Sequence, residues 1–130
     1  MNLKLECVTM KGTGVITATG ELDVYSSPKL KSMLIDMYDE VANIIVDLSR
    51  IEFMDASGLG VLVGALKKMK NKGGCVFLVY CTEDIDKIFK ITGLCNVFPI
   101  YDSSEREFRL EQSHIDDVLA LREVLLAAKK

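Results

Sequence analysis

Residues 44–60 read IIVDLSRIEFMDASGLG, and this stretch decides the fold. It opens on three consecutive β-branched residues, Ile44 to Val46, which predict a strand buried on both faces. From residue 58 to residue 71 the apolar side chains recur at helical spacing; they are Leu59, Leu62, Val63, Leu66 and Met69. The stretch therefore leads from a buried strand into an amphipathic helix, and ligand and interaction sites of open α/β sheets collect at such junctions.

Two strands and a helix are predicted before this stretch. Residues 3–10 and 15–19 alternate apolar and polar side chains across a turn at Lys11-Gly12, which predicts an antiparallel hairpin ending at Gly20. A helix follows, with Ser26 or Ser27 as its cap and Pro28 in its first turn. Its predicted apolar face holds Leu30, Met33, Leu34, Met37 and Val41.

Strands and helices continue to alternate after the stretch. Lysines near the end of the helix over 58–71 suit the helix dipole, and Gly73-Gly74 closes that helix. Residues 75–80 predict a buried strand, and a third helix follows, with Thr82 as its cap, Ile85, Ile88 and Phe89 facing inward, and Gly93 at its end. Residues 97–101 predict a short strand that Pro99 confines to a sheet edge. This order predicts an α/β fold, a mixed β-sheet packed with helices in a single domain.

The last thirty residues carry a different pattern. Ser104 with Glu107, and Ser113 with Asp116, are typical helix starts, and one long helix or two short helices fit equally well. The apolar stripe that follows them consists of Phe108, Ile115, Val118, Leu119, Leu121, Leu125 and Leu126. We therefore expect additional helical structure at the C-terminal end.

Composition narrows the function classes. The 130 residues include 16 Lys and Arg against 19 Asp and Glu, a net charge of −3, which argues against nucleic acid and against a polybasic membrane anchor. No apolar run has the length of a membrane-spanning helix, and the first ten residues do not form a signal peptide. We expect a cytoplasmic protein without membrane contact.

The cysteines and the single histidine do not predict a metal site. Cys7, Cys75, Cys81 and Cys95 form no Cys-x-x-Cys pair, and His114 lies far from them in the sequence. We expect the four thiols to be reduced and to act as small core side chains.

Ser57 stands at the start of the helix over 58–71, where the first backbone N–H groups have no intrahelical partner. Gly58 and Gly60 each cost a helix about 1 kcal/mol relative to alanine, so another backbone or the sheet must come close to them. On position alone, a purely structural interpretation is favoured, in which Asp55 or Ser57 caps the helix and the glycines serve packing.

Two short motifs favour a functional interpretation of Ser57 over the purely structural one. The string Asp55-Ala56-Ser57-Gly58-Leu59-Gly60 resembles the Asp-Ser-Ser-Gly-Leu-Gly signature of STAS domains, in particular of the bacterial anti-sigma factor antagonists. A second signature of that family, Gly-Glu-Leu-Asp after the hairpin, is present as Gly20-Glu21-Leu22-Asp23. The order of elements agrees with the family from residue 3 to about residue 112. The resemblance therefore implies a STAS domain over residues 1–112, and the additional C-terminal helical segment over 113–130 exceeds the usual family domain. The two motifs together, each on the matching element, are a strong signal.

The resemblance implies a phosphorylation site at Ser57 and a partner-binding surface made of Asp23, Asp55, Ala56, Ser57, Gly58, Leu59 and Gly60. It implies that the unmodified protein binds an anti-sigma factor, which is also a serine kinase, and thereby releases a sigma factor. The kinase would phosphorylate Ser57 with its own ATP, and a metal-dependent serine phosphatase would reverse the reaction. Ala56 departs from the family pattern, in which a serine stands at this position, and this puts the fit of the kinase in doubt.

Three alternatives compete with the phosphorylation switch. A catalytic serine needs a base, but His114 lies in the C-terminal segment and Asp55 stands where a nucleophile elbow has glycine, so we expect no enzyme activity. No phosphate-binding glycine motif is present, so we expect no nucleotide or other cofactor on this chain. A STAS scaffold or sensor module, acting through protein contacts or as a weak homodimer through the C-terminal helix, is the third alternative.

Overall fold

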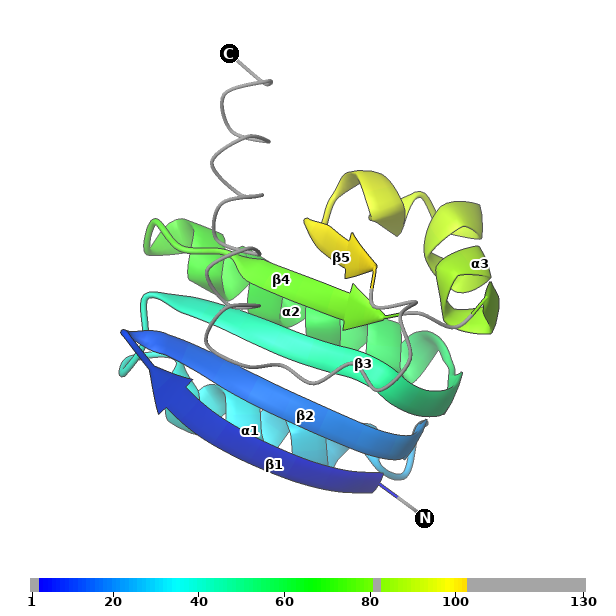
Figure 1. Cartoon of the computed structure of the whole chain (residues 1–130), viewed down its shortest axis with the longest axis horizontal. Coiled ribbons are helices and arrows are strands. Elements are labelled where there is room, and N and C mark those ends of the chain that lie inside the picture. The colour runs from blue at the N-terminus through cyan, green and yellow to red at the C-terminus, as the bar shows by residue number, and fades with distance from the viewer. Residues whose placement is uncertain (1–2, 81–82, 103–130) are drawn as a thin grey trace.

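The computed structural model describes residues 3–80 and 83–102, which fold around one five-stranded sheet (Figure 1). The strands follow the chain in the order β1-β2-β3-β4-β5; β1 and β2 pair antiparallel, and every later pair is parallel. The sheet is therefore mixed, as predicted. The elements are β1 (Leu3–Met10), β2 (Thr13–Leu22), α1 (Ser27–Met37), β3 (Asn43–Met54), α2 (Ala56–Asn71), β4 (Val76–Tyr80), α3 (Glu83–Ile91), the 3-10 turn η1 (Leu94–Asn96) and β5 (Ile100–Asp102).

The predicted hairpin of β1 and β2 is confirmed, but its second strand is longer than expected. Strand β2 continues past Gly20 to Leu22, because its far side pairs in parallel with β3 as far as Leu22 opposite Met54. Gly20 supplies a positive φ of 112° beside a register shift instead of ending the strand. The extension carries the Gly-Glu-Leu-Asp motif to the same end of the sheet as the end of β3.

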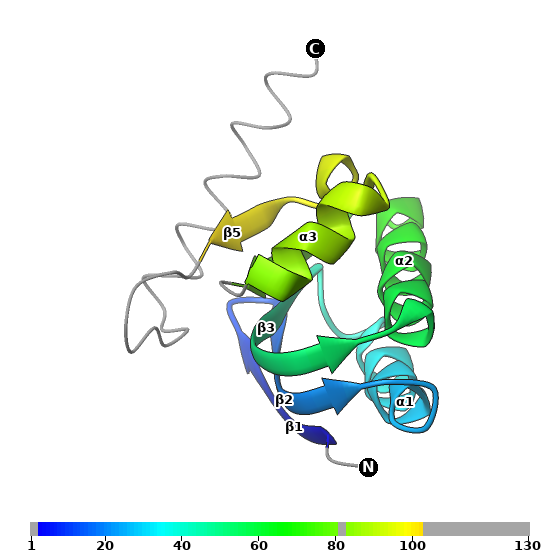
Figure 2. The ribbon, with the colours of Figure 1, turned by 90° about the vertical axis from the view of Figure 1, so that its right-hand side faces the viewer.

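Helices α1 and α2 lie side by side on one face of the sheet (Figure 2). In α1, Pro28 occupies the first turn as predicted, and Leu30, Leu34 and Met37 are buried. Ser26, one of the two predicted caps, makes no side-chain capping bond. Val41 lies beyond the end of α1 and is buried in the connection to β3, so its assignment to the helix face was wrong.

The stretch from residue 44 to residue 60 is confirmed as a strand followed by a helix, and both elements are longer than predicted. Residues 44–48 of β3 are all buried, as expected of a strand covered on both faces. The strand runs on to Met54 because β2 pairs with it over that length. Helix α2 begins at Ala56, so Gly58 lies inside the helix.

The last described elements complete one continuous core. Strand β4 and helix α3 are present as predicted, and Phe89 of α3 packs edge-on against Phe98, with 6.0 Å between the ring centroids. The edge strand is β5, which begins at Ile100, after Pro99, and not at residue 97 as predicted. Thr82 and the predicted C-terminal helical segment lie outside the described residues. Cys75 is a core residue, whereas Cys7 is exposed, which corrects the expectation for that thiol.

Candidate functional site

Asp55 caps helix α2. Its Oδ1 accepts hydrogen bonds from the backbone N–H groups of Ser57 at 2.8 Å and of Gly58 at 3.4 Å. The carboxylate thereby occupies two of the N–H groups that have no partner within the helix. The capping role considered for Asp55 on sequence grounds is present, and it leaves the side chain of Ser57 unused by the cap.

The second carboxylate oxygen of Asp55 connects the two sequence motifs. Asp55 Oδ2 accepts a hydrogen bond from the backbone N–H of Val24 at 3.2 Å, and Asp55 N–H donates to the carbonyl oxygen of Leu22 at 3.2 Å. The loop that carries Asp23 is therefore fixed directly against the start of α2. Residues 20–23 and 55–60, which are separated by more than thirty positions in the chain, form one surface.

Asp23 organises its own loop. Its Oδ1 accepts from the backbone N–H groups of Tyr25 and Ser26, each at 2.9 Å, while Ser26 Oγ donates to the carbonyl oxygen of Glu21 at 2.8 Å. The bond from the backbone N–H of Ser26 is the main reason that the pKa of Asp23 is lowered from its ordinary value. Asp23 is therefore ionised in the folded loop at neutral pH and rigidly positioned.

This lowered pKa predicts a pH dependence of stability. A carboxyl whose pKa is lower in the folded protein stabilises it above the unfolded pKa, and this contribution is lost as the pH falls through the folded pKa. We expect the melting temperature of the parent to exceed that of Asp23→Asn at pH 6, and the gap to shrink as the pH falls below 3.8, the ordinary value. Thermal scans of both proteins from pH 6 to pH 2 measure this gap; a gap that stays constant contradicts the prediction.

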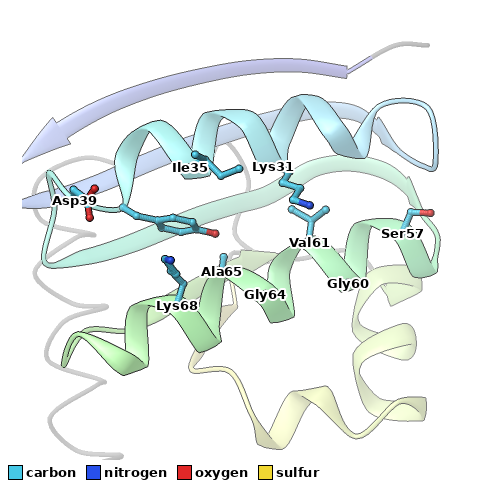
Figure 3. A pocket seen from close by; sticks show the side chains of 10 residues that line it. Lys31, Ile35, Asp39, Ser57, Gly60, Val61, Gly64, Ala65 and Lys68 are labelled. Carbon is cyan, nitrogen blue, oxygen red and sulfur yellow. The ribbon is translucent and has the colours of Figure 1, made fainter.

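Ser57 presents its hydroxyl at the end of a groove between α1 and α2 (Figure 3). The residue is half-buried, and its Oγ forms no hydrogen bond with any residue in ranges 3–80 and 83–102. Ser57 thus stands, half-buried, at a helix start whose first N–H groups are already capped by Asp55.

The glycines of the motif serve different purposes. A Cβ on Gly58 would lie 2.7 Å from Leu22 Cγ and 3.1 Å from the Leu22 carbonyl oxygen, so Gly58 allows the close packing that sequence analysis expected. A Cβ on Gly60 or Gly64 would meet nothing within 4 Å. The packing explanation is therefore wrong for Gly60, which is exposed. Gly60 and Gly64 leave the surface of α2 open, and each costs the helix about 1 kcal/mol relative to alanine.

The contrast between these glycines gives a stability prediction. We expect Gly58→Ala to lower the free energy of unfolding by about 1–3 kcal/mol, because Leu22 and its carbonyl must shift. We expect Gly60→Ala to raise it by about 0.5–1 kcal/mol, because alanine favours the helix and meets nothing. Urea denaturation of the two variants beside the parent tests both signs; equal effects would refute the packing difference.

Three large apolar side chains surround the site and were not predicted from the sequence. Tyr25 is 83% exposed, Val24 56% and Phe53 51%. Val24 and Tyr25 belong to the loop that Asp55 holds, and Phe53 lies opposite Glu21 in the strand pair that ends at the site. Exposed apolar residues of this size are typical of a protein-binding surface.

The described part of the chain contains neither a metal-ligand cluster nor a membrane-spanning helix. Within residues 3–80 and 83–102, no three His, Cys, Asp or Glu side chains are grouped so as to hold a metal ion. Over the same ranges, no helix has the length and apolar character needed to span a membrane.

Comparison with known proteins gives the family of this fold, in which a β-hairpin is followed by α/β units and Asp55 caps the helix start that carries Ser57. The sequence model of the STAS domain matches residues 4–107. The anti-sigma-B factor antagonist of Bacillus subtilis strain 168 is 33% identical over 105 residues, which are 81% of this chain and 96% of that protein. The anti-sigma-B factor antagonist of Staphylococcus aureus strain NCTC 8325 is also 33% identical, over 82% of this chain and all of that protein. The chain belongs to the STAS domain family.

Solved structures agree with this assignment. An anti-sigma factor antagonist from Mycobacterium paratuberculosis superposes with a TM-score of 0.76 at 24% identity, covering 93% of this chain and 95% of that one. The Bacillus cell fate determinant SpoIIAA in its phosphorylated form superposes with a TM-score of 0.68 at 26% identity, covering 90% and 99%. The first of these similarities supports the fold alone.

Proposed function

We propose that this protein is a cytoplasmic anti-sigma factor antagonist whose partner binding is switched off by phosphorylation of Ser57. The observation that carries the proposal is the half-buried Ser57 on a helix start that Asp55 has already capped, with a hydroxyl that makes no hydrogen bond to the described part of the chain. The names of the relatives support the function, and the existence of a phosphorylated form of SpoIIAA supports the modification. No catalytic role is assigned to this chain.

The switch follows from charge and desolvation. A phosphate on Ser57 adds about −1.5 to −2 charges at neutral pH. The N–H groups of Ser57 and Gly58 already bind Asp55, so the nearest helix donors are occupied and a second anion stands beside the phosphate. The favourable dipole effect, about 0.3–1 kcal/mol, is opposed by this repulsion, so the fold is barely affected. A partner that covers Ser57 would instead have to bury the new charge, which costs several kcal/mol.

The proposed partner-binding surface combines acidic and apolar groups. Asp23 and Asp55 lie in the two connected loops, and Val24, Tyr25 and Phe53 supply exposed apolar area around them. The complementary partner surface carries basic groups around an apolar patch. Leu59 and Gly60 extend the same surface along α2, and Gly58 contributes by letting Leu22 pack closely beneath it.

The proposed chemistry takes place on partner enzymes. Ser57 Oγ attacks the γ-phosphorus of ATP bound by the anti-sigma factor kinase, the hydroxyl proton passes to a base of that kinase, and ADP leaves. A metal-dependent serine phosphatase adds water to the phosphoserine and releases inorganic phosphate. Ala56 is exposed on the first turn of α2 and removes one hydroxyl next to the acceptor, which leaves Ser57 as the single acceptor of the motif.

The test begins with capture of partners by the full chain from an extract of its own cells, followed by mass spectrometry of partners and bait. The captured kinase is then purified and incubated with ATP and with the parent, Ser57→Ala or Ser32→Ala. Ser32 is an exposed serine of α1 outside the site, so this variant is the matched control. We expect phosphate on Ser57 in the parent and the control, and none on Ser57→Ala. Phosphate on another residue, or a partner that binds regardless of phosphorylation, would favour the scaffold or sensor alternative.

A further inference from the structure

The groove between α1 and α2 extends well beyond Ser57 (Figure 3). Its volume is about 670 Å³, and its apolar lining comes from both helices, with Ile35 from α1 and Val61 and Ala65 from α2. Ile35 is 55% exposed, although it is a large aliphatic side chain. An apolar groove between two helices is a shape that proteins use to bind a third helix.

Gly60 and Gly64 keep this groove open. They are one helical turn apart, both line the groove, and a Cβ added at either position would meet no other atom within 4 Å. The part of α2 from Ser57 to Lys68 rises about 16 Å at 1.5 Å per residue, which matches three turns of a partner helix. The sequence thus keeps glycine, a poor helix former, where space alone does not require it.

The charged side chains that line the groove indicate the charge of the helix that it would bind. Lys31 projects from α1 and Lys68 from α2, and neither ammonium group has a carboxylate within ion-pair distance among the described residues. Asp39, beyond the end of α1, is the one acidic residue that lines the groove, and it lies towards the Lys68 end (Figure 3). Tyr38 also lines the groove and adds a hydroxyl that is neutral at neutral pH, and burial raises its pKa further above the ordinary value.

We propose that this groove binds an amphipathic helix of a protein partner whose apolar stripe packs onto Gly60 and Gly64 and whose flanking carboxylates face Lys31 and Lys68. The occupant therefore differs from the partner of the Ser57 surface, which has to be basic around its apolar patch. Ser57 and Gly60 belong to both surfaces, so the two partners compete for them. The docking goes beyond the proposed function, and its test on unphosphorylated protein stands or falls separately from it.

Two fluorescein-labelled synthetic peptides of fifteen residues serve as probes. Both are helical with one leucine stripe, flanked by glutamates in one peptide and by lysines in the other. Fluorescence anisotropy with the full chain measures their affinities. We expect the glutamate peptide to bind at least tenfold more tightly than the lysine peptide. We expect Gly64→Leu to weaken its binding at least tenfold without lowering the melting temperature, because leucine fills the groove and favours the helix.

A charge reversal tests the specificity. Lys31→Glu combined with Lys68→Glu is expected to invert the preference between the two peptides, whereas Lys70→Glu combined with Lys87→Glu, which changes the net charge equally outside the groove, leaves it unchanged. The proposal is overturned if the parent binds neither peptide, if Gly64→Leu binds as the parent does, or if the two double variants behave alike. Concentration-dependent sedimentation of the parent that Gly64→Leu abolishes would assign the groove to a second copy of this chain and would also overturn it.

Discussion

Ser57→Asp is expected to weaken binding of the captured anti-sigma factor about a thousandfold while the melting temperature stays within a few degrees of the parent's. A thousandfold loss corresponds to about 4 kcal/mol, which is the scale of a charge buried without a partner in an interface. The charge lies next to Asp55, whose carboxylate already uses the N–H groups of Ser57 and Gly58. The fold tolerates the new carboxylate because Ser57 is half-buried at the end of an open groove.

Isothermal titration calorimetry with the purified partner measures the affinity, and Ser57→Ala separates charge from the loss of the hydroxyl. The alanine variant is expected to bind within a factor of a few of the parent, because the Ser57 Oγ makes no hydrogen bond to the described part of the chain. If Ser57→Asp binds as tightly as the parent, the charge mechanism is wrong even though the fold is right.

The second large effect is expected from Asp55→Ala, which should lower the free energy of unfolding by about 2–3 kcal/mol. Loss of the helix cap accounts for up to about 2 kcal/mol. The Val24 N–H, which bonds Asp55 Oδ2 at 3.2 Å, also loses its partner, and a lost hydrogen bond of this kind contributes about 1 kcal/mol. Urea denaturation followed by circular dichroism measures the change.

Asp55→Asn is the matched control, because asparagine caps helices about as well as aspartate and has nearly the same shape. We expect it to retain the capping contribution but to lose, like Asp55→Ala, the bond from the Val24 N–H, because its single amide oxygen serves the cap and its amide nitrogen donates and cannot accept. Since the bond that holds the loop of Val24 and Tyr25 against α2 is lost in both variants, both should also weaken partner binding. Equal destabilisation by both variants would show that the negative charge, and not the capping geometry, matters.

The fold could be predicted from the sequence where the signal is local. The alternation in 3–10, the β-branched run at Ile44 and the helical spacing after Gly58 each identify an element without reference to its neighbours. The extension of β3 to Met54 was missed because parallel pairing with β2 sets that length. Val41 was misplaced because its burial, caused by tertiary packing, resembles the periodicity of the preceding helix.

The site was predictable as two motifs but not as one surface. Sequence spacing does not reveal the bond between Asp55 and Val24, and it was only the resemblance to STAS domains that suggested a site shared by Asp23 and Ser57. The exposure of Tyr25 and Phe53 was missed, since neither a loop nor a strand end has a periodicity that marks its exposed positions. Similarly, Gly60 and Gly64 could be identified as keeping a groove open only once α1 was seen beside α2.

The central proposal is that a single phosphate on Ser57 abolishes docking and leaves the domain intact. The most direct measurement compares the partner affinity of unmodified protein with that of protein phosphorylated stoichiometrically on Ser57, both checked by intact mass and thermal unfolding. We expect the phosphorylated protein to melt within a few degrees of the unmodified protein and to bind the partner about a thousandfold more weakly, with binding restored after phosphatase treatment. Equal affinities, or a phosphorylated protein that no longer folds, would contradict the account.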